Sequence, residues 1–257
     1  PPLPEQQRIA EVLGTVDSAI QKVGGAIERT ERLKRGLMQR LLTEGIGHDR
    51  FKETKVGRMP EEWEVVKIGD IADDFVGGGT PSTSNQDYWN GKIAWMTSAH
   101  INGRTVTSGQ RHITEKGLNE SSTHLIPKGN LLVATRVGIG KAAINSIDIA
   151  ISQDLTGVII DRDIVNADYV YWFLLINLNK LKSLAQGSTI KGILKDDLAK
   201  LKIPLPPLPE QRRIAEILST VDKKQELERQ RKEKLEKVKK GLMNELLTGK
   251  KRLKVEV

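Results

Sequence analysis

A repeat with a constant offset of 205 positions constrains this chain more than any other feature. Residues 1–17 read PPLPEQQRIAEVLGTVD and residues 206–222 read PPLPEQRRIAEILSTVD, so 14 of the 17 paired positions are identical. The same offset aligns RGLMQRLLT (35–43) with KGLMNELLT (240–248) without a gap. A repeat of about 43 residues at both ends predicts two copies of one structural unit, which flank a unique insert of about 160 residues.

Each copy of the repeat has the pattern of one long helix. Pro4 and Pro209 suit a first helical turn, and Glu5 and Glu210 follow at the positive end of the helix dipole. Apolar residues then recur at alternating spacings of four and three, which is typical of a coiled-coil seam. About 38 residues give a rod of roughly 57 Å. The predicted seam consists of Ile9, Leu13, Val16, Ile20, Val23, Ile27, Leu37, Leu41, Ile214, Leu218, Val221, Leu242 and Leu246.

The middle of each helix keeps this pattern less strictly. In the second copy, the apolar stripe is expected to continue through Leu227, Leu235 and Val238 within a strongly charged stretch. Glycine weakens a helix by about 1 kcal/mol, so we expect the helical glycines to mark points of close packing. They are Gly24, Gly25, Gly36 and Gly241. Periodicity alone also allows ordinary amphipathic helices that pack on a core.

The insert has a different pattern, in which short strand-like runs alternate with polar, Gly-rich loops. Strands are expected at residues 64–68, 92–96, 130–134, 142–144 and 156–160, and helices at 169–184 and 196–201. This order predicts an α+β head with a mixed sheet. If the two ends of the head lie close together, the rods form a long antiparallel two-helix coiled-coil stalk. The proline-rich residues 204–207 are expected to act as a stiff elbow before the second helix.

Composition excludes several classes of protein. The 257 residues include no Cys, which rules out thiol catalysis, disulfides and Cys-based zinc sites. No apolar run approaches the roughly 20 residues that span a bilayer, and no signal peptide is recognisable. We therefore expect a cytoplasmic protein without a membrane partner. The net charge is +8, of which residues 206–257 carry +6 and residues 46–205 only +1. The basic excess lies on the second helix, where a solvated coiled-coil face is the plainer interpretation.

No catalytic constellation is apparent. Residues 138–141 read GIGK, but Thr135 and Ala142 stand where a phosphate-binding loop needs Gly and Ser or Thr, so we expect a tight turn. The Glu-Thr-Lys of residues 53–55 lacks the upstream Pro-Asp of a nuclease, and the Asn/Asp-Pro-Pro-aromatic motif of adenine methyltransferases is absent. No metal site is expected, because the histidines lack metal-ligand spacing. These histidines are His48, His100, His112 and His124.

The repeated motif resembles a known family. PLPPLPEQRRIAEIL…VD…KKGLMNELLTG is similar to the conserved regions of type I restriction–modification specificity (S) subunits. Segments of the head resemble the target recognition domains of that family. These are WEVVKIGDI (63–71), GGTPS (78–82) followed by Tyr88 and IAW (93–95), IPKG (126–129) and QGSTI (186–190). The resemblance covers nearly the whole chain, and the helical motif carries most of it because it occurs twice.

The resemblance implies three parts with distinct roles. Residues 1–46 and 204–257 would be conserved helical regions, the second with a basic tail. Residues 47–203 would be a target recognition domain that reads one half of a bipartite site in double-stranded DNA. Such a subunit is non-catalytic and scaffolds adenine methyltransferase (M) subunits and, through them, restriction (R) subunits. It binds no cofactor itself, because S-adenosylmethionine, ATP and Mg²⁺ belong to the partner subunits.

The order of parts departs from the family pattern, which is domain, helix, domain, helix. This chain has helix, domain, helix and begins with Pro1 rather than Met. The resemblance therefore implies either a fragment of a two-domain subunit or a half-subunit that forms a homodimer. The bases that are read and the spacing between half-sites do not follow from the sequence.

Polar residues in the head loops are the candidates for DNA contact. Hydrogen bonds to base edges read sequence, whereas phosphate contacts set register. Ordinary turn chemistry is the alternative for each Ser, Thr and Asn. The candidates are Thr80, Ser82, Thr83, Ser84, Asn85, Ser98, His100, Asn102, Arg104, Arg136, Thr189 and Lys191. The near-neutral charge of the head predicts weak binding without partners.

Two other functions remain open at this point. A self-contained nuclease would cleave DNA without partners in the presence of a metal ion, and would depend on Glu53 or Lys55. A coiled-coil adaptor would have no role in DNA specificity, which an exchange of residues 47–203 would test.

Overall fold

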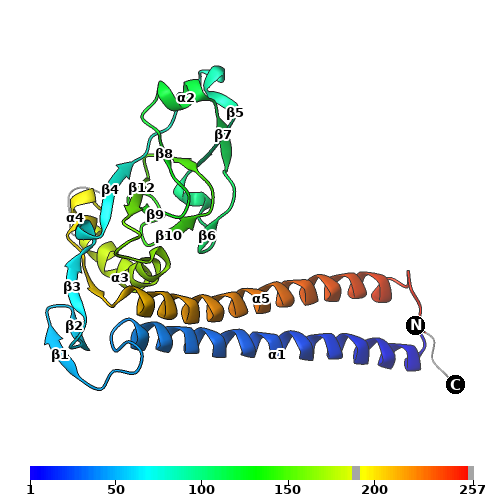
Figure 1. Cartoon of the computed structure of the whole chain (residues 1–257). Coiled ribbons are helices and arrows are strands. Elements are labelled where there is room, and N and C mark those ends of the chain that lie inside the picture. Colours follow the sequence, from blue (N-terminus) through cyan, green and yellow to red (C-terminus); the bar gives the residue numbers. More distant parts are fainter. Residues whose placement is uncertain (187–191, 254–257) are drawn as a thin grey trace. The chain divides into compact units, whose positions relative to one another are not determined.

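The computed structural model describes residues 1–186 and 192–253, and the chain forms two compact units (Figure 1). The helical unit consists of Pro1–Leu37 and Ile217–Val257, and the head unit consists of Met38–Glu216. Within the described residues, no helix is both long enough and apolar enough to cross a membrane.

The helical unit is built from two long helices, α1 (Leu3–Leu41) and α5 (Leu208–Leu247). Each begins one residue before its expected proline, so that proline lies in the first turn as predicted. Within the unit the helices run side by side in opposite directions, because Lys34 pairs with Asp222 and Lys239 pairs with Asp17 at 2.5 Å (Figure 1).

Every residue of the predicted seam is buried or half-buried. The predicted continuation of the seam in the middle of α5 is wrong at two of its three residues, because Leu227 is 56% exposed and Val238 is 51% exposed, whereas Leu235 is half-buried as expected. Buried Gln225 follows Val221 at the spacing of four that the seam requires. The seam therefore passes through polar positions here, and the two apolar side chains face solvent.

The helical glycines are not points of close packing. No atom lies within 4 Å of a Cβ built on Gly24, Gly36 or Gly241, and on Gly25 the Cβ would meet the Arg29 guanidinium at 3.4 Å. The expectation was wrong because these positions face open space or a flexible side chain. The helical glycines therefore mark no close contact within the described chain.

Two packed sheets form the centre of the head unit. The five-stranded sheet has the order β4-β12-β9-β10-β6, and the four-stranded sheet has the order β7-β5-β11-β8. Both are mixed, because β10 pairs with β6 and β11 pairs with β5 in parallel, whereas their other pairs are antiparallel. The α+β class is as predicted, but one mixed sheet was expected and two are present, with two further two-stranded sheets, β1-β2 and β13-β3.

The sequence pattern predicted some of the strands and missed others. The five predicted strands correspond to β3, β5, β9, β10 and β12. The strands β6, β7, β8 and β11 were missed, and none of them exceeds three residues, which is too short for a periodicity. The longer strands β1, β2, β4 and β13 were missed as well. The strands are β1 (Phe51–Thr54), β2 (Gly57–Pro60), β3 (Glu64–Lys67), β4 (Ala72–Gly77), β5 (Trp89–Met96), β6 (Thr105–Val106), β7 (Arg111–Ile113), β8 (His124–Ile126), β9 (Leu131–Ala134), β10 (Ala142–Asn145), β11 (Ile149–Ile151), β12 (Leu155–Ile160) and β13 (Lys202–Leu205).

The four-stranded sheet buries both of its faces. Alternate side chains point to opposite faces of a strand, so Met96 and Ile151 join the core between the two sheets. Trp95 and Ala150, their neighbours along the chain, pack with Trp89 in a second cluster on the other face. The indole rings of Trp89 and Trp95 meet edge to face at 5.4 Å.

One helix of 20 residues, two short helices and three 3-10 turns complete the described part of the head unit. They are α2 (Glu115–Asn119), α3 (Ala167–Gln186), α4 (Lys195–Ala199) and the 3-10 turns η1 (Ile68–Asp70), η2 (Gln86–Tyr88) and η3 (Ser98–His100). Pro204 was expected in an elbow, but it lies in β13 opposite Val65 of β3. The hydroxyl of Tyr169 in α3 donates to the Pro204 carbonyl at 2.7 Å. The segment before α5 is therefore held by pairing with a strand and a helix.

The repeated glutamate of the second copy binds three groups inside the head unit. Glu210 accepts hydrogen bonds from the backbone N–H of Ile46 at 2.9 Å and from the indole N–H of Trp63 at 3.0 Å. Its Oε1 also lies 2.9 Å from Nε2 of His48. Glu210 thus ties the start of α5 to the segment that follows α1.

The equivalent glutamate of the first copy makes a matching contact in the helical unit. Glu5 accepts from Nε of Arg252 at 2.7 Å and from the backbone N–H of Leu253 at 3.3 Å, so it binds the segment that follows α5. The hydrogen bond and charge of Arg252 lower the pKa of Glu5 below its ordinary value. Each copy therefore uses the same residue to hold the chain beyond the opposite helix.

Candidate nucleic-acid interface

The turn at residues 152–154, between β11 and β12, joins three loops that are far apart in the sequence. The hydroxyl of Thr80 donates to Oε1 of Gln153 at 2.5 Å. The backbone N–H and the hydroxyl of Ser98 both bind Oδ2 of Asp154. The backbone N–H of Thr135 donates to the Asp154 carbonyl at 3.0 Å. We call this turn the 152–154 junction.

The first loop, residues 77–85, rests on the tryptophan cluster. The Trp95 indole donates to the Gly79 carbonyl at 3.2 Å, and the Trp89 indole donates to the Ser82 carbonyl at 3.0 Å. A Cβ on Gly78 would lie 2.2 Å from the Ser152 carbonyl oxygen, so only glycine allows the loop this close to the junction. The backbone of the loop is thus fixed while several of its side chains remain free to face a ligand.

The predicted residues of the first loop fall into two groups. Thr80, Ser82, Thr83 and Ser84 are exposed, and the hydroxyls of Ser82 and Ser84 lie 2.8 Å apart. Asn85 is half-buried, and its Oδ1 accepts from the Asp87 backbone N–H at 3.1 Å, which caps η2. Asn85 therefore has a turn-forming role, and the four hydroxyl residues form the accessible surface.

The second predicted loop is less uniformly available. Ser98 is 1% exposed and bound to Asp154, so its contribution in this structure is to support the junction. Arg104 forms an ion pair with Asp168 in the first turn of α3. His100 is half-buried with Nε2 3.1 Å from the Ser108 carbonyl, whereas Asn102 is exposed.

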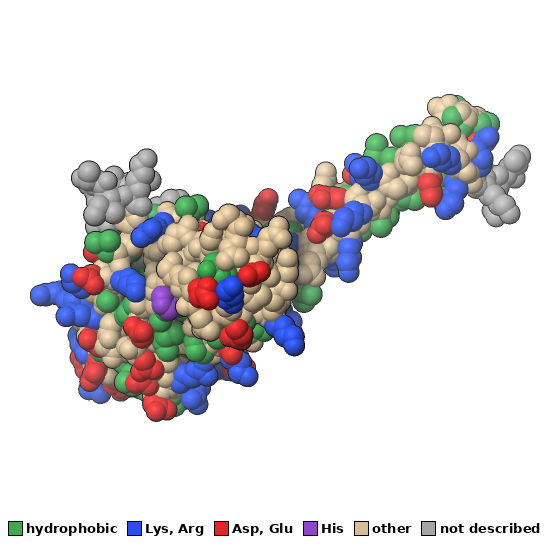
Figure 2. Space-filling model, turned by 90° about the horizontal axis from the view of Figure 1, so that it is seen from above, with side chains coloured by type: hydrophobic (Ala, Val, Ile, Leu, Met, Phe, Trp, Pro, Cys, Tyr) green, Lys and Arg blue, Asp and Glu red, His purple; other side chains and the backbone are tan. Residues whose placement is uncertain are grey.

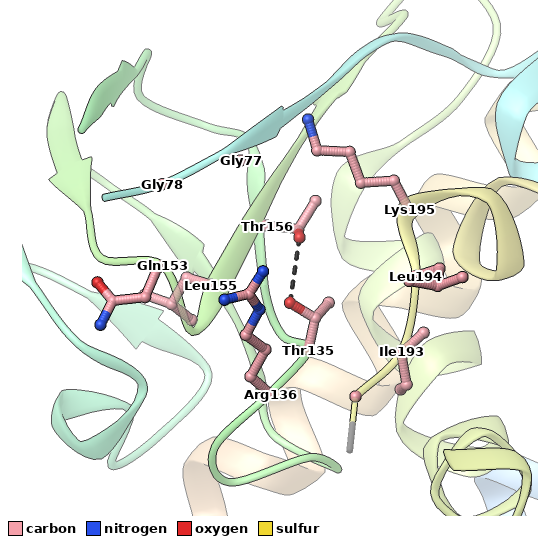
Figure 3. A pocket seen from close by; sticks show the side chains of 11 residues that line it. Gly77, Gly78, Thr135, Arg136, Gln153, Leu155, Thr156, Ile193, Leu194 and Lys195 are labelled. Carbon is pink, nitrogen blue, oxygen red and sulfur yellow. Dashed lines mark hydrogen bonds between the residues drawn. The ribbon is translucent and has the colours of Figure 1, made fainter. Parts of the chain in front are cut away.

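Arg136 lines a cavity beside the junction (Figure 3). The cavity has a volume of about 340 Å³ and is bounded by the end of β4, the start of β12 and the residues that lead into α4. Its lining includes Thr135, Gln153, Thr156 and Lys195, and the Thr135 and Thr156 hydroxyls lie 3.2 Å apart. The predicted Thr189 and Lys191 lie outside the described residues.

Sequence reasoning missed the junction and the second cation of the cavity. Gln153, Asp154 and Lys195 were not among the candidates, although residues 152–154 are a polar break between two apolar runs. That break is a turn signal. The missing information was which loops the turn would contact.

Charges of both signs are interspersed on the visible face of the molecule (Figure 2). Near the first loop, Lys116 pairs with Asp87 at 3.0 Å, and this carboxylate raises the pKa of Lys116. The Arg111 guanidinium stacks on the Trp89 ring, 3.5 Å from its centroid. The cations near the first loop are therefore held in place by specific neighbours, and the visible face as a whole is not uniformly basic.

Other motifs from the sequence have simple structural accounts. The GIGK of residues 138–141 forms a tight turn, as predicted, in which the Lys141 N–H donates to the Gly138 carbonyl at 3.1 Å. Glu53 and Lys55 are exposed in the β1–β2 hairpin, where Glu53 pairs with Arg58 across the strands. Across the residues that the structure covers, no cluster of three His, Asp or Glu side chains has the arrangement of a metal site.

The chain is similar in sequence to a known family of proteins. Residues 60–237 match the model of the type I restriction modification DNA specificity domain. The chain is 33% identical to the putative type I restriction enzyme MjaX specificity subunit of Methanocaldococcus jannaschii, over 99% of this chain and 59% of that protein. It is 36% identical to the MjaIX specificity subunit of the same organism, over 73% of this chain and 44% of that protein.

Solved structures show the same fold. The HsdS subunit from Thermoanaerobacter tengcongensis superposes with a TM-score of 0.64 at 21% identity, over 96% of this chain and 58% of that one. The S subunit from M. genitalium superposes with a TM-score of 0.63 at 13% identity, over 94% and 60%. The chain thus spans between 44% and 60% of the length of these four relatives. Because the family model covers more than half of its residues, the chain belongs to the type I restriction–modification DNA specificity domain family.

Proposed function

We propose that this chain is a DNA sequence-specificity subunit of a type I restriction–modification complex and that its head reads one half of a bipartite DNA target. The observation that carries the proposal is the convergence of three loops on the 152–154 junction, where exposed hydroxyls of the first loop lie with Gln153, which Thr80 binds at 2.5 Å. Hydrogen-bonding side chains on a fixed backbone are what reading of base edges requires.

The chain has a scaffolding and DNA-reading role in this proposal, not a catalytic one. Adenine methylation, translocation and cleavage would be carried out by M and R subunits, which bind S-adenosylmethionine, ATP and Mg²⁺. Since its target is DNA, the complex would act in the cytoplasm. Residues 47–203 would form the target recognition domain, and residues 1–46 and 204–257 the conserved helical regions.

The two helices would form an antiparallel coiled-coil stalk that sets the separation of two recognition domains. The alternating spacing of the seam and its burial support this role. Comparison of the two repeat copies supports a docking surface for a second head at the end of the helical unit. Met38 and Leu42, in the head unit, are 8% and 3% exposed. Their equivalents Met243 and Leu247, in the helical unit, are 40% and 60% exposed.

The glutamine next to the repeated glutamate is likewise buried in one copy of the repeat and exposed in the other. In both copies its amide donates to the proline carbonyl five residues earlier, Gln6 to Pro1 at 2.7 Å and Gln211 to Pro206 at 2.8 Å. Gln211 is buried and also accepts from the Asn166 N–H at 2.8 Å, whereas Gln6 is exposed. Gln6 in the first copy thus makes the same local hydrogen bond as Gln211. Its side chain is exposed, whereas Gln211 in the second copy also binds Asn166 of the head. A second head could come from the same polypeptide or from a second copy of this chain.

Mapping of methylated adenines in cells that carry this chain with its cognate M subunits tests the proposal. The expected result is a bipartite motif with a fixed gap, one half of which changes when residues 47–203 are exchanged for those of a relative. A palindromic motif would indicate two copies of this head. Methylation without a defined motif, or a motif unchanged by the exchange, would contradict the proposal.

A further inference from the structure

We propose that the cavity between Arg136 and Lys195 binds one backbone phosphate of the target DNA. This inference rests on the proposed function. It assigns part of the DNA to a site in which the predicted Arg136 is joined by Lys195, which the sequence did not single out. Figure 3 shows the two cationic side chains on different segments, Arg136 after β9 and Lys195 at the start of α4.

The lining of the cavity favours an anion. Of the described residues that line it, Arg136 and Lys195 are the charged ones, and none is Asp or Glu. Among the described residues, neither cation forms an ion pair, and both are exposed. Two positive charges in one cavity complement the oxygens of a phosphate.

The walls of the cavity are fixed before any ligand binds. The Ile193 N–H donates to the Thr135 carbonyl at 2.7 Å, which holds the segment before α4 against the segment after β9. On the opposite side, the stem of Lys195 lies over the end of β4, because a Cβ on Gly77 would be 3.2 Å from its Cε and 3.4 Å from its Nζ. A site with fixed walls loses little conformational freedom on binding.

A guanine base is the competing ligand, because arginine can bind its O6 and N7 together. The edge of guanine carries no charge, so a base in this cavity would leave Lys195 partly desolvated and unpaired, which is unfavourable. A phosphate is shared by both cations. The geometry therefore assigns the cavity to positioning of the DNA backbone rather than to sequence reading.

The test uses the chain assembled with its M subunits and the substitutions Arg136→Gln and Lys195→Gln. Affinity is measured for the cognate duplex, for duplexes with single changed base pairs and for unrelated DNA, across a series of salt concentrations. Each substitution is expected to weaken binding to all duplexes alike and to reduce the slope of log K against log salt by about 1. If one phosphate is shared, the double variant loses less than the sum of the single losses.

Lys55→Gln is the matched control, because Lys55 is an exposed lysine in the β1–β2 hairpin, outside the cavity. It should leave affinity and salt slope unchanged. Unchanged salt slopes in the cavity variants, or additive losses in the double variant, would overturn the shared phosphate site. A loss of discrimination at one base pair would instead identify a base-reading site. Binding by the wild-type assembly without any sequence preference would contradict the proposed function, whatever the cavity variants do.

Discussion

The hydroxyl of Thr80 donates a 2.5 Å hydrogen bond to Oε1 of Gln153, a residue 73 positions later in the chain. This bond joins the Gly-rich first loop to the turn between β11 and β12. It also fixes which end of the Gln153 amide points away from Thr80. Donor and acceptor positions at this surface are therefore set by a contact between two loops.

Thr80→Val tests the importance of that contact for DNA reading. Valine keeps the shape of threonine but removes the hydroxyl, so the Gln153 amide loses its orientation. Since one such hydrogen bond contributes about 1 kcal/mol, we expect discrimination between cognate and altered duplexes to fall by roughly fivefold. Competition binding with the M-subunit assembly measures this, with Thr83→Val as the control in the same loop. Equal behaviour of the two variants would argue against a special role for Thr80.

Asp154→Ala is expected to weaken the head unit itself. Asp154 is 8% exposed and binds both the N–H and the hydroxyl of buried Ser98. Leaving buried donors without an acceptor costs about 1–3 kcal/mol. Urea unfolding should show this loss, and Ser98→Ala, which removes only the hydroxyl, should lose less. An Asp154→Ala variant as stable as the wild type would show that solvent or another group satisfies Ser98.

Glu210→Gln should destabilise the junction between α5 and the segment that follows α1. The Ile46 N–H and the Trp63 indole donate to different carboxylate oxygens, so the amide of Gln can accept from only one of them and presents a donor to the other. We expect a loss of about 2 kcal/mol in the free energy of unfolding. The control is Glu236→Gln on the same helix, where the carboxylate is exposed in an ion pair with Lys232. Such exposed pairs contribute at most about 1 kcal/mol, so near-equal losses would contradict the assigned role.

The contact between Glu5 and the segment that follows α5 should depend on pH. Arg252 lowers the pKa of Glu5 below the ordinary value of 4.5. A carboxyl with a lowered pKa in the folded state stabilises fully above its unfolded pKa and loses that stabilisation as pH falls through the folded pKa. The amide NMR signal of Leu253, which donates to Glu5, should therefore shift with a midpoint below 4.5. Glu5→Gln should abolish this titration, and a midpoint at or above 4.5 would contradict it.

Equivalent exposed residues on the two helices provide a test of partner assembly. Leu33 and Val238 are separated by the repeat offset of 205 and are 55% and 51% exposed. Their replacement by Ser should leave thermal unfolding nearly unchanged, because little apolar surface leaves the core. If the proposed M subunits use these positions, each substitution should weaken assembly in size-exclusion or sedimentation experiments. Unaltered assembly would place the M-subunit contacts elsewhere on the chain.

The sequence by itself determined the features that repeat or have a clear period. Two copies at a fixed offset predicted α1 and α5 and their seam, because a period of three and four residues has one geometric solution. The six-residue strand β4, which contains Asp73 and Asp74, was missed, whereas strands such as β9 and β12 were predictable from their runs of apolar residues. Strands as short as β6 and β11 were not, because two or three residues carry no periodicity.

Only the tertiary structure decided which polar residues remain available for a ligand. Ser98 and Thr80 are both small hydroxyl residues in loops, yet Ser98 is buried on Asp154 and Thr80 is exposed beside Gln153. Arg104 and Arg136 likewise differ, because Asp168 pairs with the first and the second lines a cavity with Lys195. Each outcome depends on a residue distant in sequence, and its position is set by how the strands and helices of the head unit pack rather than by any local pattern.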